Sequence, residues 1–278
     1  MTRIGAAKRK AFQQTVLEHY RAHGRYGLPW RRDYDPYAIL VSEIMLQQTQ
    51  VERVVPKFEA WLKAFPTSRV LAEASVAEVL RHWQGLGYNR RALNLHKAAQ
   101  ALTAEHGGKL PQSEAALLAL PGIGPYTAGA VRAFAFNQPV VMIETNIRSV
   151  YLHHFFLERK KVDDAELLPL IEQTLDAKNP RRWYAALMDY GAHLKSQLPN
   201  PSRRSKQHTK QSTFAGSNRQ VRGAIIRVLT QNQRLSEQAL IKHVKLAPDR
   251  VRKNIVELEQ EGFLARTGRM VQLNSAGR

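Results

Sequence analysis

Residues 120–127 read Leu-Pro-Gly-Ile-Gly-Pro-Tyr-Thr, and the small residues Ala128-Gly129-Ala130 follow them. The two glycines allow a tight turn that points several backbone N–H groups one way, and the helix that opens next adds partial positive charge at its N-terminus. Apolar residues 114–120 predict a helix before the turn, so the segment predicts a helix–hairpin–helix. Backbone donors of this kind bind a nucleic-acid phosphate without reading base sequence. The residues expected at the phosphate are Gly122, Ile123, Gly124, Tyr126 and Thr127. An ordinary glycine turn between two helices is the alternative.

The composition favours a nucleic-acid partner. Lys and Arg number 42 against 23 Asp and Glu, which gives a formal net charge of +19. Such an excess commonly neutralises phosphates. A length of 278 residues suggests two domains. No apolar run reaches membrane-spanning length and no apolar signal segment opens the chain, so we expect a cytoplasmic, nucleoid-associated protein. Cysteine is absent, which excludes disulfides, a thiol nucleophile and a thiolate-held metal or iron–sulfur cluster.

The order of elements predicts three segments along the chain. Helical spacing of apolar residues runs through residues 1–197 without a convincing strand, so this part is predicted to be all-α. Residues 198–217 are polar and basic and are predicted to be a linker. Residues 218–278 are predicted to form a second, smaller domain.

This second domain is predicted to be a winged helix. Its expected helices cover residues 219–230, 236–245 and 247–260, and two short strands are expected at 263–266 and 269–273. The third helix of a winged helix usually enters a major groove. The residues expected on its outer face, in contact with DNA, are Arg250, Lys253 and Asn254. Winged helices also bind proteins, but from residue 203 onward 16 basic residues face 5 acidic ones, which favours DNA.

Two carboxylates interrupt apolar sequence. Glu43 lies within residues 40–46, and Glu144 follows residues 139–143. A buried acid is either paired or kept for function with a shifted pKa. For each alone, a capping or ion-paired role is the plain alternative. Together, an acid that protonates a leaving base and a carboxylate that stabilises a cationic sugar suit cleavage of an N-glycosidic bond.

Residues 10–195 contain several motifs that resemble those of a known family. They are Leu28-Pro29-Trp30-Arg31, Pro36-Tyr37, Val-Ser-Glu-Ile-Met-Leu-Gln-Gln-Thr-Gln-Val at 41–51, Gly85-Leu86-Gly87-Tyr88, the turn at 120–127 and the segment that contains Asn146. In this order they resemble the MutY adenine DNA glycosylases. That family is part of the helix–hairpin–helix glycosylase superfamily, which also contains endonuclease III.

The resemblance implies a two-lobed, all-α glycosylase domain that flips a nucleotide into the cleft between its lobes, because the glycosidic bond is out of reach in the stacked duplex. It implies that Glu43 is the general acid and that Glu144 occupies the position of the family's catalytic aspartate. Tyr126 stands where bifunctional relatives carry a Schiff-base lysine. Since tyrosine cannot form that base, the resemblance implies a monofunctional glycosylase without lyase activity.

Other positions take their roles from the same resemblance. The residues that would fill the gap and probe the opposite base are Gln47, Gln48, Thr49 and Tyr88. The residues that would line the base pocket are Trp30, Arg31, Val51, Ala185 and Met188. The implied partner is double-stranded DNA with a damaged or mismatched base, bound by a monomer. No cofactor is expected, except that the hairpin could hold a monovalent or divalent cation.

The chain also departs from the family pattern. Glu144 is one methylene longer than the usual aspartate, and Thr145 follows where glycine is usual. The family's four cluster cysteines are missing, as in a clusterless variant, and Ala185 stands where adenine-specific members often carry Gln or Glu. A winged helix replaces the family's C-terminal domain that reads oxidised guanine.

These departures leave three functions open. The first is excision of adenine opposite guanine or 8-oxoguanine, which Val51 favours. The second is a mismatch thymine or uracil glycosylase, which Ala185 favours. The third is a catalytically inactive damage-binding protein, which Glu144 and the missing cluster favour and Glu43 opposes.

Overall fold

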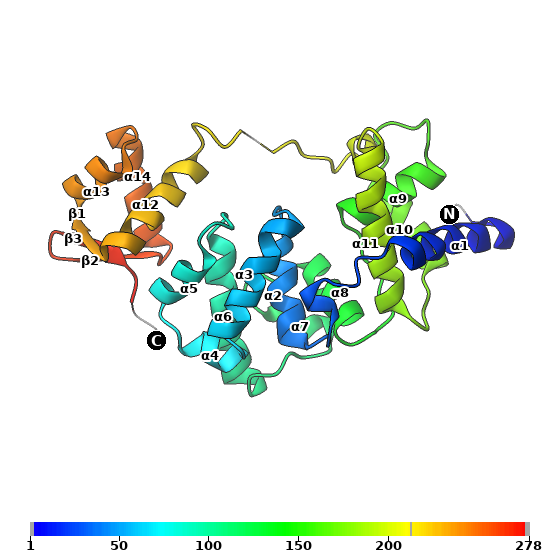
Figure 1. The fold of residues 1–278 in the computed structure, drawn as a ribbon, viewed down its shortest axis with the longest axis horizontal. Helices are drawn as coiled ribbons and strands as arrows, with labels where there is room; N and C mark the ends of the chain where they lie inside the picture. Colours follow the sequence, from blue (N-terminus) through cyan, green and yellow to red (C-terminus); the bar gives the residue numbers. More distant parts are fainter. Residues whose placement is uncertain (1–2, 212, 276–278) are drawn as a thin grey trace. The chain divides into compact units, whose positions relative to one another are not determined.

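The computed structural model describes residues 3–211 and 213–275, and within them the chain is mostly helical (Figure 1). The helices of the first two hundred residues are α1 (Ala6–His23), α2 (Pro36–Leu46), α3 (Val51–Ala64), α4 (Ser68–Glu73), α5 (Val76–Trp83), α6 (Arg90–His106), α7 (Glu114–Ala119), α8 (Pro125–Phe134), α9 (Thr145–Phe155), α10 (Asp164–Thr174) and α11 (Pro180–Gln197). Two 3-10 helices, η1 (Pro29–Arg31) and η2 (Pro201–Arg204), lie beside them. The predicted all-α class of this part is confirmed.

The described chain divides into two compact units that are not consecutive in sequence. The first contains residues up to Glu43, Gln112–Ala119 and Ile123–Lys210, and the second contains Ile44–Pro111, Leu120–Gly122 and residues from Gln211 onward. The C-terminal module therefore belongs with α3–α6 in one unit, whereas residues 198–210 belong with α8–α11 in the other.

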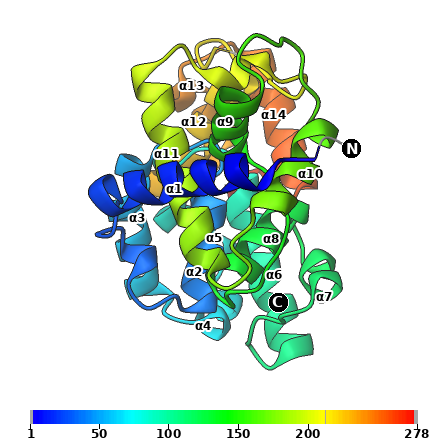
Figure 2. The ribbon, with the colours of Figure 1, turned by 90° about the vertical axis from the view of Figure 1, so that its right-hand side faces the viewer.

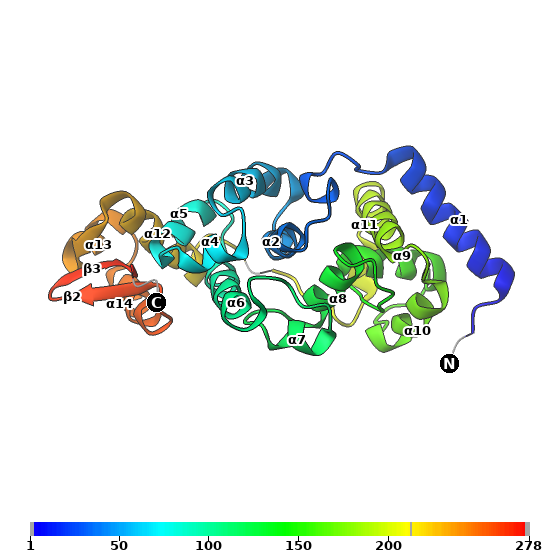
Figure 3. The same ribbon diagram turned by 90° about the horizontal axis from the view of Figure 1, so that it is seen from below.

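Helix α11 is the centre of the first unit. It packs against α9, which lies beside α10, and against α1, which crosses it (Figures 2 and 3). Its buried side chains include Trp183, Tyr184 and Leu187. Gly191 lets α9 approach closely, because a Cβ there would lie 2.8 Å from the Cα of Asn146 and closer still to its carbonyl. The first turn of α9 is thus fixed by a missing side chain on α11.

Arg91 of α6 joins two loops of the second unit. Its Nη1 donates at 2.7–2.8 Å to the carbonyls of Ile44 and Met45 in the last turn of α2 and to the carbonyl of Gln47, which follows that helix. Its Nη2 donates to the carbonyls of Leu86 and Gly87 at 3.2 and 3.1 Å and to Thr49. A cation is favourable at a helix C-terminus. Burial nevertheless lowers the pKa of Arg91 to about 10.

The hairpin between α7 and α8 only partly follows the expected geometry. Gly122 has a φ of +76°, and a Cβ there would also lie 2.5 Å from the Cβ of Asn94, so glycine is required twice over. Gly124 has an ordinary φ of −95° and open space where a Cβ would be, so the turn does not depend on its being glycine. It lies at the N-cap of α8, and Pro125 opens that helix.

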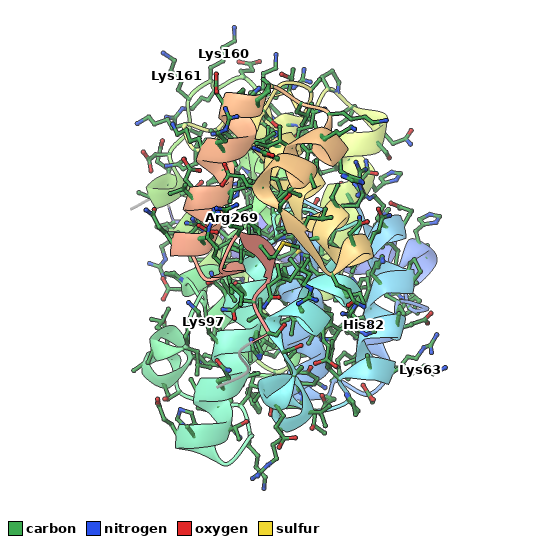
Figure 4. All side chains as sticks on the ribbon, turned by 90° about the vertical axis from the view of Figure 1, so that its left-hand side faces the viewer. Lys63, His82, Lys97, Lys160, Lys161 and Arg269 are labelled. Carbon is green, nitrogen blue, oxygen red and sulfur yellow. The ribbon has the colours of Figure 1, made fainter. Side chains whose placement is uncertain are left out.

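The C-terminal module contains α12 (Asn218–Asn232), α13 (Glu237–Val244), α14 (Pro248–Gln260) and the strands β1 (Arg234–Ser236), β2 (Leu264–Thr267) and β3 (Met270–Leu273). The sequence predicted two strands, but β1 adds a third, and the antiparallel sheet has the order β1-β3-β2. Arg269 lies in the exposed turn between β2 and β3 (Figure 4). These helices and strands form a winged-helix arrangement.

The expectation that Asn254 lies on the outer face of α14 is wrong. Asn254 is 1% exposed, and its Nδ2 donates to the Arg250 carbonyl at 2.8 Å. It shares the helical spacing of Val251, Ile255 and Leu258, which form the buried face of α14. A contact from its side chain to DNA is therefore excluded, whereas Arg250 and Lys253 are exposed.

The basic segment after α11 is held by protein contacts. Ser205 forms a parallel bridge with Val162, whose N–H donates to the Arg204 carbonyl at 2.9 Å. The Arg204 guanidinium donates to the carbonyls of Leu152, Phe156 and Leu157 at the end of α9. Residues 201–206 therefore contact the end of α9 and the backbone of Val162.

Substitution of the two helical glycines Gly191 and Gly223 should have opposite effects on stability. Gly191→Ala should lower the free energy of unfolding by about 1–3 kcal/mol or more, because its Cβ overlaps the α9 backbone. Gly223→Ala should raise it by about 0.5–1 kcal/mol, because its site in α12 is open and alanine favours helix. Chemical denaturation measures both. A Gly191→Ala protein as stable as Gly223→Ala would refute the close packing of α9 on α11.

Candidate active site

The side chain of Glu43 is buried in the second half of α2. It is 8% exposed, and its Oε2 accepts a hydrogen bond from the Tyr126 hydroxyl of α8 at 2.9 Å. Both residues belong to the first unit. The sequence expected Tyr126 both at the catalytic site and at the hairpin phosphate, and its hydroxyl lies with the carboxyl of Glu43.

The pKa of Glu43 is raised to about 7, mainly by burial and also by the charge of Glu144. The Tyr126 hydrogen bond and the Arg31 guanidinium oppose this rise, because they stabilise the carboxylate. A carboxyl group with this pKa keeps its proton in a large fraction of molecules at neutral pH. It can therefore act as an acid under conditions where an exposed glutamate cannot.

Glu144 caps α9. Its Oε1 accepts hydrogen bonds from the backbone N–H groups of Asn146 at 2.5 Å and Ile147 at 2.8 Å. Its Oε2 accepts one from the Asn146 side chain at 3.2 Å. Burial raises the pKa of Glu144, while these backbone hydrogen bonds and nearby Lys195 and Arg148 oppose the rise. The capping geometry that the sequence allowed as the plain alternative is thus present, in the same unit as Glu43 and close enough to shift its pKa.

A buried acid that the sequence reasoning missed holds Arg31 in place. Asp189 of α11 accepts from Arg31 Nη1 at 2.8 Å and Nη2 at 2.9 Å, in a two-pronged pair. It also accepts from the backbone N–H and the guanidinium of Arg25. These partners lie about 160 positions away in sequence. The only available signal was one acid within the apolar run of α11, at Trp183–Tyr190.

The other residues expected at the site fall into the two units. Trp30 and Ala185 are buried in the first unit, and the Sδ of Met188 lies 3.8 Å from the Asn146 side chain. Val51, Gln47, Gln48, Thr49 and Tyr88 belong to the second unit. There, Gln48 and Tyr88 both have positive φ values, +55° and +47°, which non-glycine residues rarely adopt. Such backbone strain is typical of loops that bind a partner.

The hairpin presents backbone rather than side chains. Gly122 and Gly124 are exposed, whereas the side chains of Ile123 and Thr127 are buried. This arrangement leaves main-chain groups of the turn accessible, and the expected phosphate contact stays a prediction.

The chain cannot hold the iron–sulfur cluster that the resemblance associates with this fold. It contains no cysteine. Residues 3–211 and 213–275 contain no group of three histidine, aspartate or glutamate side chains that could hold a metal ion. In the same residues no helix is both long and apolar enough to cross a membrane.

Residues 41–171, which include Glu43, Tyr126 and Glu144, match the family described as HhH-GPD superfamily base excision DNA repair protein. Among curated relatives, an adenine DNA glycosylase of Mycolicibacterium smegmatis is 37% identical over 74% of this chain and 76% of its own length. One of Buchnera aphidicola is also 37% identical, over 65% of this chain and 52% of its own length. One of Homo sapiens is 36% identical over 66% of this chain and 35% of its own length.

Solved structures show the same fold. A thermostable thymine-DNA glycosylase superposes with a TM-score of 0.60 and 27% identity, covering 67% of this chain and 87% of that one. Endonuclease III in a trapped covalent complex with DNA gives 0.54 at 17% identity, over 77% of this chain and 93% of that one. The chain spans about half the length of the Buchnera relative and about three quarters of the mycobacterial one. It belongs to the adenine DNA glycosylases of the HhH-GPD superfamily.

Proposed function

We propose that this chain is a monofunctional DNA glycosylase that flips a mismatched adenine out of the duplex and excises it, with guanine or 8-oxoguanine on the opposite strand. The observation that carries the proposal is the buried Glu43, with its pKa near 7 and its hydrogen bond from Tyr126. The names of the relatives support adenine as the base. The partner is double-stranded DNA, and a monomer suffices because Glu43, Tyr126 and Glu144 come from one chain.

Glu43 acts as the general acid. Its carboxyl group donates a proton to a ring nitrogen of the flipped adenine, so that the base can leave neutral. The bond between the base and the sugar C1′ then breaks, and its electron pair leaves with the base. Trp30, Arg31, Ala185 and Met188 form the pocket on the Glu43 side. Asp189 positions Arg31 there, since it accepts hydrogen bonds from both terminal guanidinium nitrogens, Nη1 and Nη2.

Glu144 stabilises the positive charge that develops on the sugar. Its carboxylate cannot swing freely, because Oε1 is held by two backbone N–H groups and Oε2 by the Asn146 amide. A preorganised charge of this kind needs no reorganisation as the bond breaks. Water then adds to C1′ and its proton passes to a carboxylate, which leaves an abasic sugar and free base.

Tyr126 accounts for the absence of a lyase step in this proposal. Its hydroxyl donates to Glu43 at the position where an amine would be needed for a Schiff base. The backbone of residues 122–127 holds a phosphate at the start of α8, where a monovalent or divalent cation could also sit. The loops with Gln47, Gln48, Thr49 and Tyr88 enter the gap left by the flipped nucleotide, and Val51 lies next to the first of these loops in the same unit.

The direct test is a panel of duplexes with single mispairs, analysed with and without alkali under single-turnover conditions. We expect alkali-dependent strand cleavage at adenine opposite guanine or 8-oxoguanine and no covalent complex after borohydride treatment. Cleavage only at thymine or uracil mispairs would show that the enzyme excises one of these pyrimidines and not adenine. Trapping by borohydride would refute the monofunctional reaction.

Glu43→Gln tests the general acid on the same panel of duplexes. The amide keeps the shape of the side chain but has no acidic proton, so base release should fall by about 10²–10⁴-fold with little change in duplex affinity. Glu59→Gln makes the same change at an exposed site on α3 and should behave like the wild type. If Glu43→Gln retains more than about a tenth of the wild-type rate, Glu43 is not the general acid.

The pH dependence should follow the Glu43 carboxyl. Base release needs the protonated acid, so the rate should fall as the pH rises through about 7. Tyr126→Phe removes a hydrogen bond that stabilises the carboxylate, so the pKa of Glu43 should rise and the falling limb should move to higher pH. Tyr26→Phe, at an exposed tyrosine, is the control. A limb that stays in place or moves to lower pH in Tyr126→Phe would contradict this assignment.

A further inference from the structure

The start of the C-terminal module contacts Tyr88 and Gln48, two residues of the second unit that have positive φ values. Arg219, in the first turn of α12, donates through Nη1 to the Tyr88 hydroxyl, and its guanidinium carbon lies 5.1 Å from the centre of the Tyr88 ring. The Gln211 side chain donates to the same hydroxyl and to Gln48 Oε1, the latter at 3.3 Å. Tyr88 and Gln48 are two of the four residues expected to fill the gap left by the flipped nucleotide and to probe the opposite base. All four residues lie in one compact unit.

Ion pairs fix the position of α12 in this unit. Glu261, at the end of α14, binds Arg222 of α12 at 2.6 Å and Arg90 of α6 at 2.8 Å. The Ala77 N–H of α5 also donates to the Asn274 carbonyl at 3.0 Å. The module is therefore joined to α5 and α6 at two places. Arg219, one helical turn before Arg222, is held beside Tyr88 by this attachment.

The face of α14 that would usually enter a major groove is poorly suited to do so here. Its three basic residues are balanced by Asp249, Glu257 and Glu259. Arg250 donates to the Gly216 carbonyl at 2.9 Å, and Arg252 pairs with Asp249 at 3.0 Å. Arg266 of β2 pairs with Glu237 and Glu259. The cations near this face are largely paired with groups of the protein itself.

We propose that Arg219 reads the base opposite the excised one, with Gln211 beside it, so that the module acts through the start of α12 rather than through α14. A guanidinium is the side chain that most often recognises the O6 and N7 edge of guanine. In the absence of DNA its Nη1 donates to the Tyr88 hydroxyl. When the Tyr88 loop enters the duplex, the same donors lie at the orphaned purine and bind its O6.

The inference rests on the proposed function, but binding tests it without base release. The probe is a duplex with a 2′-fluoro-deoxyadenosine, which resists cleavage, placed opposite guanine or opposite 2-aminopurine, which lacks O6. Fluorescence anisotropy gives the dissociation constant for each duplex. We expect the wild-type chain to prefer guanine by roughly tenfold, in line with the discrimination of one good side chain–base contact.

Arg219→Met should abolish this preference, whereas Arg219→Lys should keep the overall affinity and lose the preference, because lysine keeps the charge without the forked donors. Arg227→Met changes an exposed arginine of the same helix and should leave the preference at the wild-type value. Circular dichroism confirms that each variant is folded.

Two results would overturn the inference. One is an unchanged preference for guanine in Arg219→Met. The other is an equal loss of affinity for both duplexes, which would place Arg219 on a phosphate instead of a base edge. Failure of the proposed function is recognised separately, because the wild type would then release no base from any cleavable mispair.

Discussion

The hydrogen bond from Tyr126 to the buried carboxyl of Glu43 is the contact on which the candidate active site depends. Burying an ionised carboxylate without a partner would cost several kcal/mol of desolvation free energy. The Glu43 carboxyl avoids this cost by keeping its proton up to about pH 7. Tyr126 prevents the pKa from rising further, and Glu144 prevents it from falling. The acid is thus kept in the range where a proton can be both held and donated.

Each compact unit is organised by a partly buried arginine, and the two arginines have different kinds of hydrogen-bond partner. Arg31 is bound by the carboxylate of Asp189, so its charge is compensated and its position near Glu43 is fixed. Arg91 is bound mainly by neutral carbonyls, and its pKa falls to about 10 because burial is uncompensated by an acid. The first arrangement tunes a titrating group. The second holds two loops together at the ends that carry Gln48 and Tyr88.

Local signals in the sequence predicted most of the fold. The hairpin follows from Gly122, whose positive φ no other residue adopts easily, and the helices follow from apolar spacing. Glu43 was recognisable as an acid in an apolar helix. The misassigned face of α14 was a matter of interpretation, since Asn254 shares the spacing of Val251, Ile255 and Leu258 and therefore had to be buried with them. A three-residue strand such as β1 leaves too short a pattern to detect.

Long-range partners could not be predicted from the sequence. Nothing local to Asp189 indicates that it binds arginines near residue 30, and nothing near Arg219 indicates Tyr88. The role of Gly191 also cannot be predicted from its neighbours in sequence, because the glycine leaves room for the backbone of α9. Such contacts depend on how helices pack, whereas turns and helix starts depend on residues a few positions apart.

Direct titration of the Glu43 carboxyl tests the central claim. NMR of protein labelled with carbon-13 at glutamate side chains, assigned with Glu43→Gln, should give a midpoint near pH 7 for Glu43. In Glu144→Gln the midpoint should move to lower pH, because a neighbouring negative charge has been removed. A Glu43 midpoint near 4.5 in the wild type, or one that Glu144→Gln leaves unchanged, would contradict the account.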